Sequence, residues 1–282
     1  MNQKKYFITY GSKDYSLQKK HLINLVKKSE YFDEYVSYGP KDLSKEFKQK
    51  YHEILKADRG GGYWIWKHEI ILNLLDEINY GDCIVYSSAG SSFNINGKPR
   101  LDEYFEIINS SEKGNLRFQI PNHIEKDWTT KEIFEYFNIE DTSSIRESEQ
   151  LIANHFILKK NENSIEIFNE FRKLVEVNKD LITHKYDDKN QIASFNENRN
   201  DQSILSILSK IYGAEIIEKD ETFFKPFDES QYTFPFLAVR KRKYSFYQKL
   251  KFYFRYKKNI NKPIYFGTNP TLLKRIIYKI KT

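Results

Sequence analysis

Apolar residues along most of the chain recur with the spacing of short strands and of helices in turn. Runs typical of buried strands lie at residues 5–10, 31–38, 83–86 and 151–158. Apolar residues three and four positions apart predict helices at 17–28, 66–78, 164–177 and 201–212. Because strands that alternate with helices pair into a mostly parallel sheet covered by helices, the pattern predicts an α/β fold.

Two helix boundaries are marked by particular residues. Helical spacing from Phe47 to Leu55 stops before Gly60–Gly62, because consecutive glycines are costly in a helix. Thr129 and Glu132 have the spacing of a capping box, which predicts a helix that begins there.

Charge divides the chain into two unequal parts. From Ser230 to the end there are 14 Lys and Arg and no acidic residue, whereas 32 basic and 39 acidic residues precede Ser230. The sequence therefore predicts a folded domain at 1–235 and a basic, aromatic-rich, helical C-terminal extension at 236–282. Cations interleaved with aromatic residues at 239–258 are typical of a peripheral membrane anchor and also of single-stranded nucleic-acid binding. A third interpretation is that the basic C-terminal segment has no binding role and its cations are simply solvated.

The absence of four motifs argues against a kinase, a dehydrogenase, a zinc hydrolase and a serine hydrolase. The P-loop, the dinucleotide G-x-G-x-x-G, the H-E-x-x-H zinc motif and the G-x-S-x-G elbow are all absent. The single Cys83 excludes an internal disulfide and a multi-cysteine metal site. No apolar run approaches the ~20 residues of a membrane-spanning helix, and the first residues lack the features of a signal peptide, so a cytoplasmic location is expected.

Three segments carry distinctive patterns: RGGGYWIWKHEI (59–70), GDCIVYSSAGSSFN (81–94) and FNENRNDQSILSIL (195–208). In this order they resemble a group of bacterial nucleotide-sugar glycosyltransferases with a GT-A fold, of the type that builds surface polysaccharide or lipooligosaccharide. The opening FITYGS and residues 125–129, 149–151 and 198–203 are similar to the same group. The resemblance covers about residues 5–213 and implies a GT-A-like, Rossmann-like central sheet.

The resemblance also implies an activity and partners. A hexosyltransferase would move a sugar from a nucleotide-sugar donor, a UDP-sugar, to a glycan or lipid-linked acceptor in capsule or lipopolysaccharide synthesis. A lipid-linked acceptor favours an anionic membrane as the partner of the basic segment, at the inner face of the cytoplasmic membrane, and no nucleic-acid partner. The alternative is a catalytically inactive scaffold of the same fold that binds membrane or RNA through its basic tail.

Candidate donor-binding residues follow from the charge and shape of such a donor. Arg59 and Lys67 flank glycines whose N–H groups suit a diphosphate, although a tight turn with solvated cations explains the same residues. Trp64 and Trp66 alternate as on an extended segment, and one of them either stacks on the donor or packs in the core. Open α/β sheets bind ligands at the ends of their strands, which adds Tyr10, Gly11 and Tyr38. The full set is Tyr10, Gly11, Tyr38, Arg59, Gly61, Gly62, Trp64, Lys67, Ser88, Ala89, Gly90, Gln150 and Gln202.

Two carboxylates are the candidates for catalysis. Asp201 is expected to accept the proton of the acceptor hydroxyl or to hold a donor hydroxyl, with Gln202 on the sugar; the alternative role is a helix N-cap. Glu149 is the second candidate base, with Gln150 beside it, and a surface strand explains it equally well.

The expected metal ligand is missing from its usual place. Where the resembling proteins carry an aspartate after the strand at 83–86, this chain has Ser88. A hydroxyl is a poor substitute for a carboxylate on Mg²⁺ or Mn²⁺. The chain is therefore either a metal-independent enzyme that relies on Arg59, Lys67 and tail cations, which we expect, or a divergent and inactive member.

Overall fold

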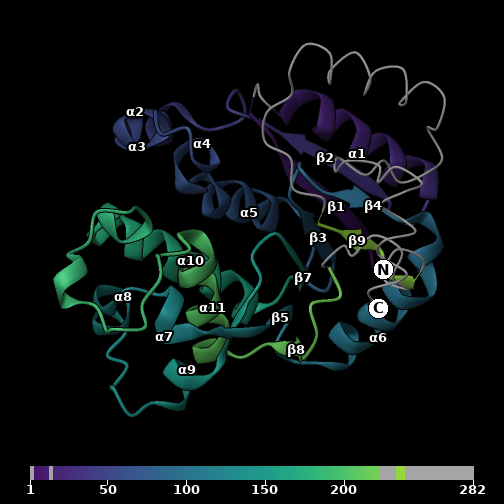
Figure 1. Cartoon of the computed structure of the whole chain (residues 1–282). Helices are drawn as coiled ribbons and strands as arrows, with labels where there is room; N and C mark the ends of the chain where they lie inside the picture. Colours follow the sequence, from purple (N-terminus) through teal and green to yellow (C-terminus); the bar gives the residue numbers. More distant parts are fainter. Residues whose placement is uncertain (1–2, 13–14, 223–232, 239–282) are drawn as a thin grey trace, which may run out of the picture.

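The central sheet has seven strands in the order β2-β1-β3-β7-β5-β6, with β8 paired to β5. The computed structural model describes residues 3–12, 15–222 and 233–238 (Figure 1). The strands of this sheet are β1 (Lys5–Tyr10), β2 (Glu34–Tyr38), β3 (Cys83–Ser87), β5 (Asn115–Ile124), β6 (Glu149–Leu151), β7 (His155–Lys159) and β8 (Glu215–Ile217).

Five of these strands run in one direction. The pairs β1–β2, β1–β3 and β5–β8 are parallel, whereas β7 is antiparallel to both β3 and β5, and β6 is antiparallel to β5. Strands β1, β2, β3, β5 and β8 therefore share a direction that β6 and β7 oppose. The prediction of an α/β fold with a mostly parallel sheet is confirmed.

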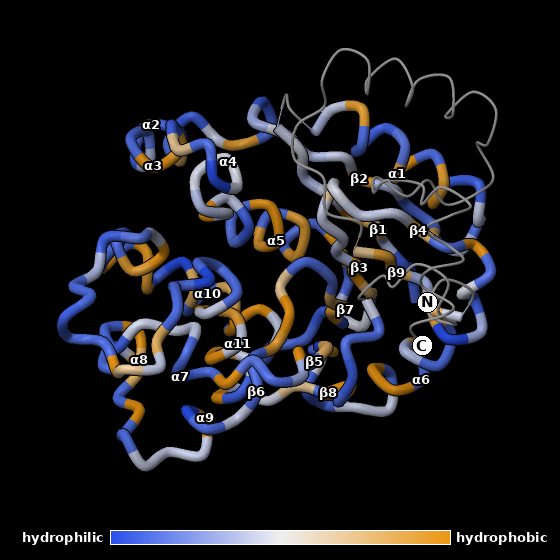
Figure 2. Tube along the Cα trace, viewed as in Figure 1, coloured by the Kyte–Doolittle hydropathy of each residue, from blue (hydrophilic) through white to orange (hydrophobic). Residues whose placement is uncertain are grey.

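Helices cover both faces of the sheet (Figure 1). Helices α1 (Ser16–Ser29) and α6 (Lys98–Ser110) bury residues such as Leu25 and Tyr104 against one face, and α5 (Trp66–Glu77), α10 (Glu162–Val177) and α11 (Asp201–Tyr212) pack on the other. Along α1, hydrophobic residues recur among hydrophilic ones (Figure 2), as expected for a helix with one buried face. Among the described residues, no helix has the length and apolar character needed to cross a bilayer.

Shorter elements connect this framework. They are α2 (Lys45–Lys50), α3 (His52–Leu55), α4 (Gly60–Tyr63), β4 (Ser92–Phe93), η2 (Ile95–Gly97), α7 (Glu125–Trp128), α8 (Lys131–Tyr136), α9 (Ser144–Glu147), η3 (Lys179–Ile182), η4 (Asp188–Asn190) and β9 (Phe236–Leu237).

The last described strand, β9, belongs to the body of the protein. It pairs antiparallel with β4, and the buried Phe236 ring stacks on His155, with ring centroids 5.2 Å apart. These residues follow directly on the domain boundary expected at Pro235. The rest of the predicted basic extension, 239–282, lies outside the described residues, and its helical character stays a prediction.

Three local predictions differ from the structure. The run 151–158 forms two strands, because β6 ends at Leu151 and β7 begins at His155; both pair with β5, and β7 pairs with β3 as well. The capping box is wrong: Thr130 precedes α8, while the Thr129 hydroxyl donates to Glu125 Oε1 at 2.6 Å. The helical stretch 47–55 is divided into α2 and α3, and no element was predicted for α6 or β5.

Candidate functional site

A cavity opens at the carboxyl ends of β1 and β3. Tyr10 ends β1, Gly11 and Ser12 follow it, and Ser88–Ser91 follow β3; both segments line the cavity. The connection from β1 leads to β2 on one side, whereas the connection from β3 leads through α6 to β5 on the other. Ligands of open α/β sheets bind at such switch points. Ten predicted site residues line the cavity: Tyr10, Gly11, Arg59, Trp64, Lys67, Ser88, Ala89, Gly90, Asp201 and Gln202.

A buried ion pair lies in the cavity wall. The Lys67 ammonium contacts Asp201 Oδ2 and donates to the Ala153 carbonyl at 2.8 Å, and the two side chains are 1% and 7% exposed. Burial raises the pKa of the Asp201 carboxyl against the opposing effect of Lys67, and burial lowers the pKa of the Lys67 ammonium. A carboxyl whose pKa is raised suits proton transfer.

A second buried cation lies near this pair. Arg117 on β5 is fully buried, and its guanidinium lies 4.2 Å from the Phe156 ring centroid. Its Nε donates to Asn115 Oδ1 at 2.7 Å, whereas Nη1 and Nη2 have no hydrogen-bond partner among the described residues. Burial lowers the pKa of Arg117 to about 9, against the favourable effect of Asp201, so the group stays charged at neutral pH. Two buried cations thus lie near the Asp201 carboxylate, which pairs with Lys67, and the site carries an excess of positive charge.

The glycine segment forms a left-handed turn. Residues 60–64 all have positive φ, which glycine adopts without the cost that Tyr63 and Trp64 incur. A Cβ on Gly60 would lie 2.4 Å from the Trp64 ring, so the glycine also makes room for the tryptophan. The Gly61 and Gly62 N–H groups donate to the Asp58 and Ala57 carbonyls at 3.3 and 3.0 Å.

Aromatic rings make up another part of the wall. Tyr10 and Trp66 stack with centroids 3.7 Å apart and planes 15° apart, and Trp66 Nε1 donates to the Gly60 carbonyl at 2.9 Å. Trp64 lines the cavity and also packs against the core. The wall therefore offers flat apolar surfaces next to the charged pair.

Residues before α11 join the glycine turn to the ion pair. Arg59 Nε donates to Asn200 Oδ1 at 3.0 Å, and Asn200 Nδ2 donates to the Ile182 carbonyl at 2.7 Å. The Asn200 backbone lies at φ 60° and ψ −122°, a region that disfavours side chains. Such strain persists where the surrounding contacts hold it, and here it sets the position of Asp201.

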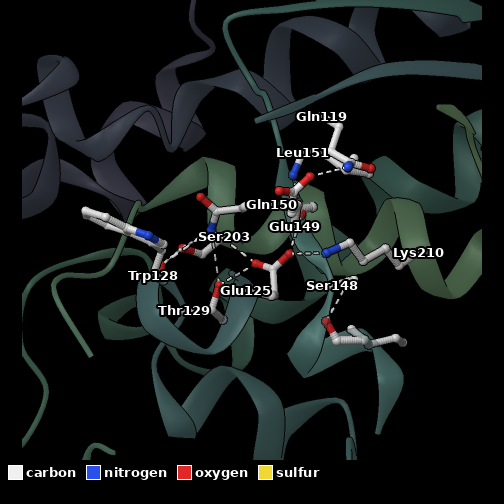
Figure 3. Close-up of polar contacts among 12 residues, drawn as sticks. Gln119, Glu125, Trp128, Thr129, Ser148, Glu149, Gln150, Leu151, Ser203 and Lys210 are labelled. Atoms are coloured by element: carbon white, nitrogen blue, oxygen red, sulfur yellow. Dashed lines mark hydrogen bonds and ion pairs between the residues drawn. The ribbon is translucent and has the colours of Figure 1, made fainter. Parts of the chain in front are cut away.

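Gln202 is hydrogen-bonded to a buried polar network around Gln150 and Glu125, and Figure 3 shows these two residues with their other partners. Gln202 Nε2 donates to Gln150 Oε1 at 2.7 Å, and Gln150 Nε2 donates to Glu125 Oε1 at 3.1 Å. The Glu125 carboxylate is fully buried and accepts further bonds from the Thr129 and Ser206 hydroxyls and from Lys210. Gln150 therefore orients Gln202 without lining the cavity itself.

Four other predicted residues also lie off the cavity wall. The Tyr38 carbonyl accepts from Gly11 N–H at 3.2 Å and from the Lys19 ammonium at 2.6 Å. Gly61 and Gly62 belong to the left-handed turn. Glu149 faces β5, where it accepts from Asn122 N–H at 2.6 Å and from the Gln119 amide (Figure 3). The roles predicted for these residues stay predictions.

Trp66, the other tryptophan considered for stacking, also lines the cavity. Ten further lining residues had no role assigned from sequence: Ser12, Tyr15, Gly60, Tyr86, Ser91, Ala153, Asn154, Arg199, Asn200 and Ala238. Some had a signal, since Gly60, Arg199 and Asn200 lie inside the distinctive segments. Ala153 and Asn154 had none, because their position depends on the break between β6 and β7.

The cavity does not have the donor set of a divalent-cation site. Its described lining holds one carboxylate, Asp201, which Lys67 engages. Among the described residues, no group of three or more His, Cys, Asp or Glu is placed to hold a metal. Hard cations such as Mg²⁺ and Mn²⁺ require several oxygen ligands, and Ser88 adds only a hydroxyl.

No protein-family model and no curated protein matches the sequence. Among solved structures, similar folds occur in a glycosyltransferase involved in glycosylation of the major capsid of PBCV-1 (9% identity, TM-score 0.46, 84% of this chain and 96% of that one) and in the galactosyltransferase LgtC (13%, 0.42, 93% and 87%). A third is the bifunctional WbbM (11%, 0.46, 99% and 52%). All three are glycosyltransferases. TM-scores below 0.5 and identities this low carry no argument about what this chain does, which depends on its own residues.

Proposed function

We propose that the protein is a glycosyltransferase that moves a sugar from a UDP-sugar to a glycan or lipid-linked acceptor in bacterial surface polysaccharide synthesis. The observation that supports this proposal is the cavity at the switch point, where the buried pair Asp201–Lys67 lies with Arg59 and Arg199. Sugar transfer needs a base for the acceptor hydroxyl and cations for the departing diphosphate. Both kinds of group line this one cavity.

Each part of the wall has a role in this proposal. Asp201 accepts the acceptor proton or holds a donor hydroxyl, and Gln202, oriented by Gln150, hydrogen-bonds the sugar. The half-buried Trp64 ring in the wall offers a flat surface for the base of the nucleotide.

We further propose that transfer is independent of a divalent metal. The cations Arg59, Lys67 and Arg199 line the cavity, whereas its single carboxylate is already paired. Calorimetric titration with UDP and with UDP-, GDP- and CMP-sugars, in Mn²⁺ and then in EDTA, tests both proposals. We expect one UDP-sugar to bind with the same affinity in EDTA. Binding only in Mn²⁺ would contradict metal independence, and binding of no nucleotide sugar would favour the inactive scaffold.

We also propose that the basic segment at 239–258 attaches the protein to anionic membranes. The charge of the segment and its aromatic residues support this, since each cation near an anionic surface contributes about 1 kcal/mol. We expect the full chain to sediment with phosphatidylglycerol vesicles, and a chain ending at Ala238, which keeps the buried β9, to stay in solution. Equal sedimentation of the two would contradict the proposal.

A further inference from the structure

One carboxylate outside the cavity wall joins two of its cations. Glu197 Oε2 contacts Arg59 Nη2 at 3.3 Å, and Glu197 Oε1 contacts Arg199 Nη1 at 3.2 Å. Both arginines line the cavity, whereas Glu197 does not. The two guanidiniums thus lie within the span of a single carboxylate.

These contacts are longer than those of a tight ion pair. Charge-assisted N–H···O bonds are usually 2.7–2.9 Å long, and the three side chains keep 27–33% of their surface exposed. A carboxylate stretched between two partners in partial contact with water is held weakly, and a stronger anion competes with it effectively.

The two arginines are held by groups other than Glu197. Arg59 Nε donates to Asn200 Oδ1, and the Arg199 guanidinium lies 4.1 Å from the Trp128 ring centroid. The Arg199 backbone is tied as well, because its N–H donates to Ser203 Oγ at 3.0 Å. A pair of guanidiniums fixed in this way is preorganised for an anion with several oxygens.

The charges around the cavity favour such an anion. Its described lining carries Arg59, Lys67 and Arg199 against Asp201, and the buried Arg117 adds a positive charge near the Lys67–Asp201 pair. Glu197 offsets one of these charges from outside the wall. An excess of positive charge remains, which a doubly charged ligand would neutralise.

We propose that the Glu197 carboxylate holds the place of a phosphate group between Arg59 and Arg199, and that a diphosphate displaces it. The inference rests on the proposed function for the choice of a diphosphate as the ligand. Glu197 then acts as an internal competitor: it keeps two like charges together, and it lowers the affinity of the site for anions.

Titration of the full chain with inorganic pyrophosphate at constant ionic strength tests this. Removing a competing charge within contact distance should tighten binding about tenfold in E197Q, and removing a cation should weaken it about tenfold in R199Q. E197D keeps the charge but shortens the side chain, so it should bind more tightly than the natural chain because the contacts with the arginines are lost.

A matched control removes the same charge elsewhere. Glu176, near the end of α10, pairs with Lys50 at 2.7 Å and does not line the cavity, so E176Q should leave pyrophosphate affinity within about twofold of the natural chain. E197Q that binds no more tightly than the natural chain, or E197D that equals it, would overturn the proposal, as would pyrophosphate binding to none of the variants. Tighter binding by E197Q with no uptake of a nucleotide sugar would support this inference and contradict the proposed function.

Discussion

Replacing Asp201 with asparagine is expected to slow sugar transfer by about 10²–10⁴-fold, the usual contribution of a positioned general base. The asparagine keeps the shape of the side chain at the start of α11 but cannot accept the proton of the acceptor hydroxyl. The measurement is release of nucleoside diphosphate from the nucleotide sugar that titration identifies, followed at saturating donor and acceptor.

The same substitution also affects folding, and a second variant separates the two effects. D201N leaves the Lys67 ammonium buried without a carboxylate, which costs about 3–5 kcal/mol. D201L combined with K67M removes both charges, so it should recover much of the free energy of unfolding while transfer stays low. Recovery of transfer along with stability would show that the pair is only structural, and unchanged turnover in D201N would remove Asp201 from the mechanism.

Replacing Glu125 with glutamine is expected to lower the free energy of unfolding by about 3–5 kcal/mol. Glu125 is completely buried, and Lys210, 9% exposed, would keep its charge without a carboxylate beside it. The loss should appear in urea denaturation as a lower midpoint with an unchanged slope.

The next residue in the chain gives a matched control. Lys126 pairs with Glu147 at the surface, where the two side chains are 32% and 57% exposed. Exposed pairs contribute about 0–1 kcal/mol, so K126M should leave the midpoint nearly unchanged. A change in E125Q as small as that in K126M would contradict the structural importance of the network behind Gln202.

The framework of the fold could be predicted from the sequence because it depends on local patterns. The strand at Lys5–Tyr10 and the helix that Gly213 ends both follow from apolar spacing and from a glycine at the helix terminus. The reversal of β7 could not be predicted, since β6 and β7 both run opposite to β5 and the chain turns back in the long connection between Ile124 and Glu149.

Single residues of the candidate site could be predicted from their local motifs, but contacts between distant segments could not. Lys67 and Asp201 were identified separately, but their contact joins residues 134 positions apart and follows from the packing of both α5 and α11 against α10. Glu125 shows the opposite case, because a fully buried carboxylate has no sequence signature that separates it from an exposed one. Buried polar residues that hydrogen-bond to the side chains of a site can be identified only once the fold shows which residues they contact.

The pairing of β9 with β4 bears on the order of events during synthesis. Phe236 packs on Phe93 and Phe118, so the hydrophobic core on that face of the sheet lacks one of its rings until residue 236 has been added. Because chains are made from the N-terminus, a nascent chain that stops before β9 exposes apolar surface, the kind of species that aggregates. All 14 cations that follow Ser230 come after Phe236 in the sequence, so they are translated only after β9, the last strand of the part that the structure describes.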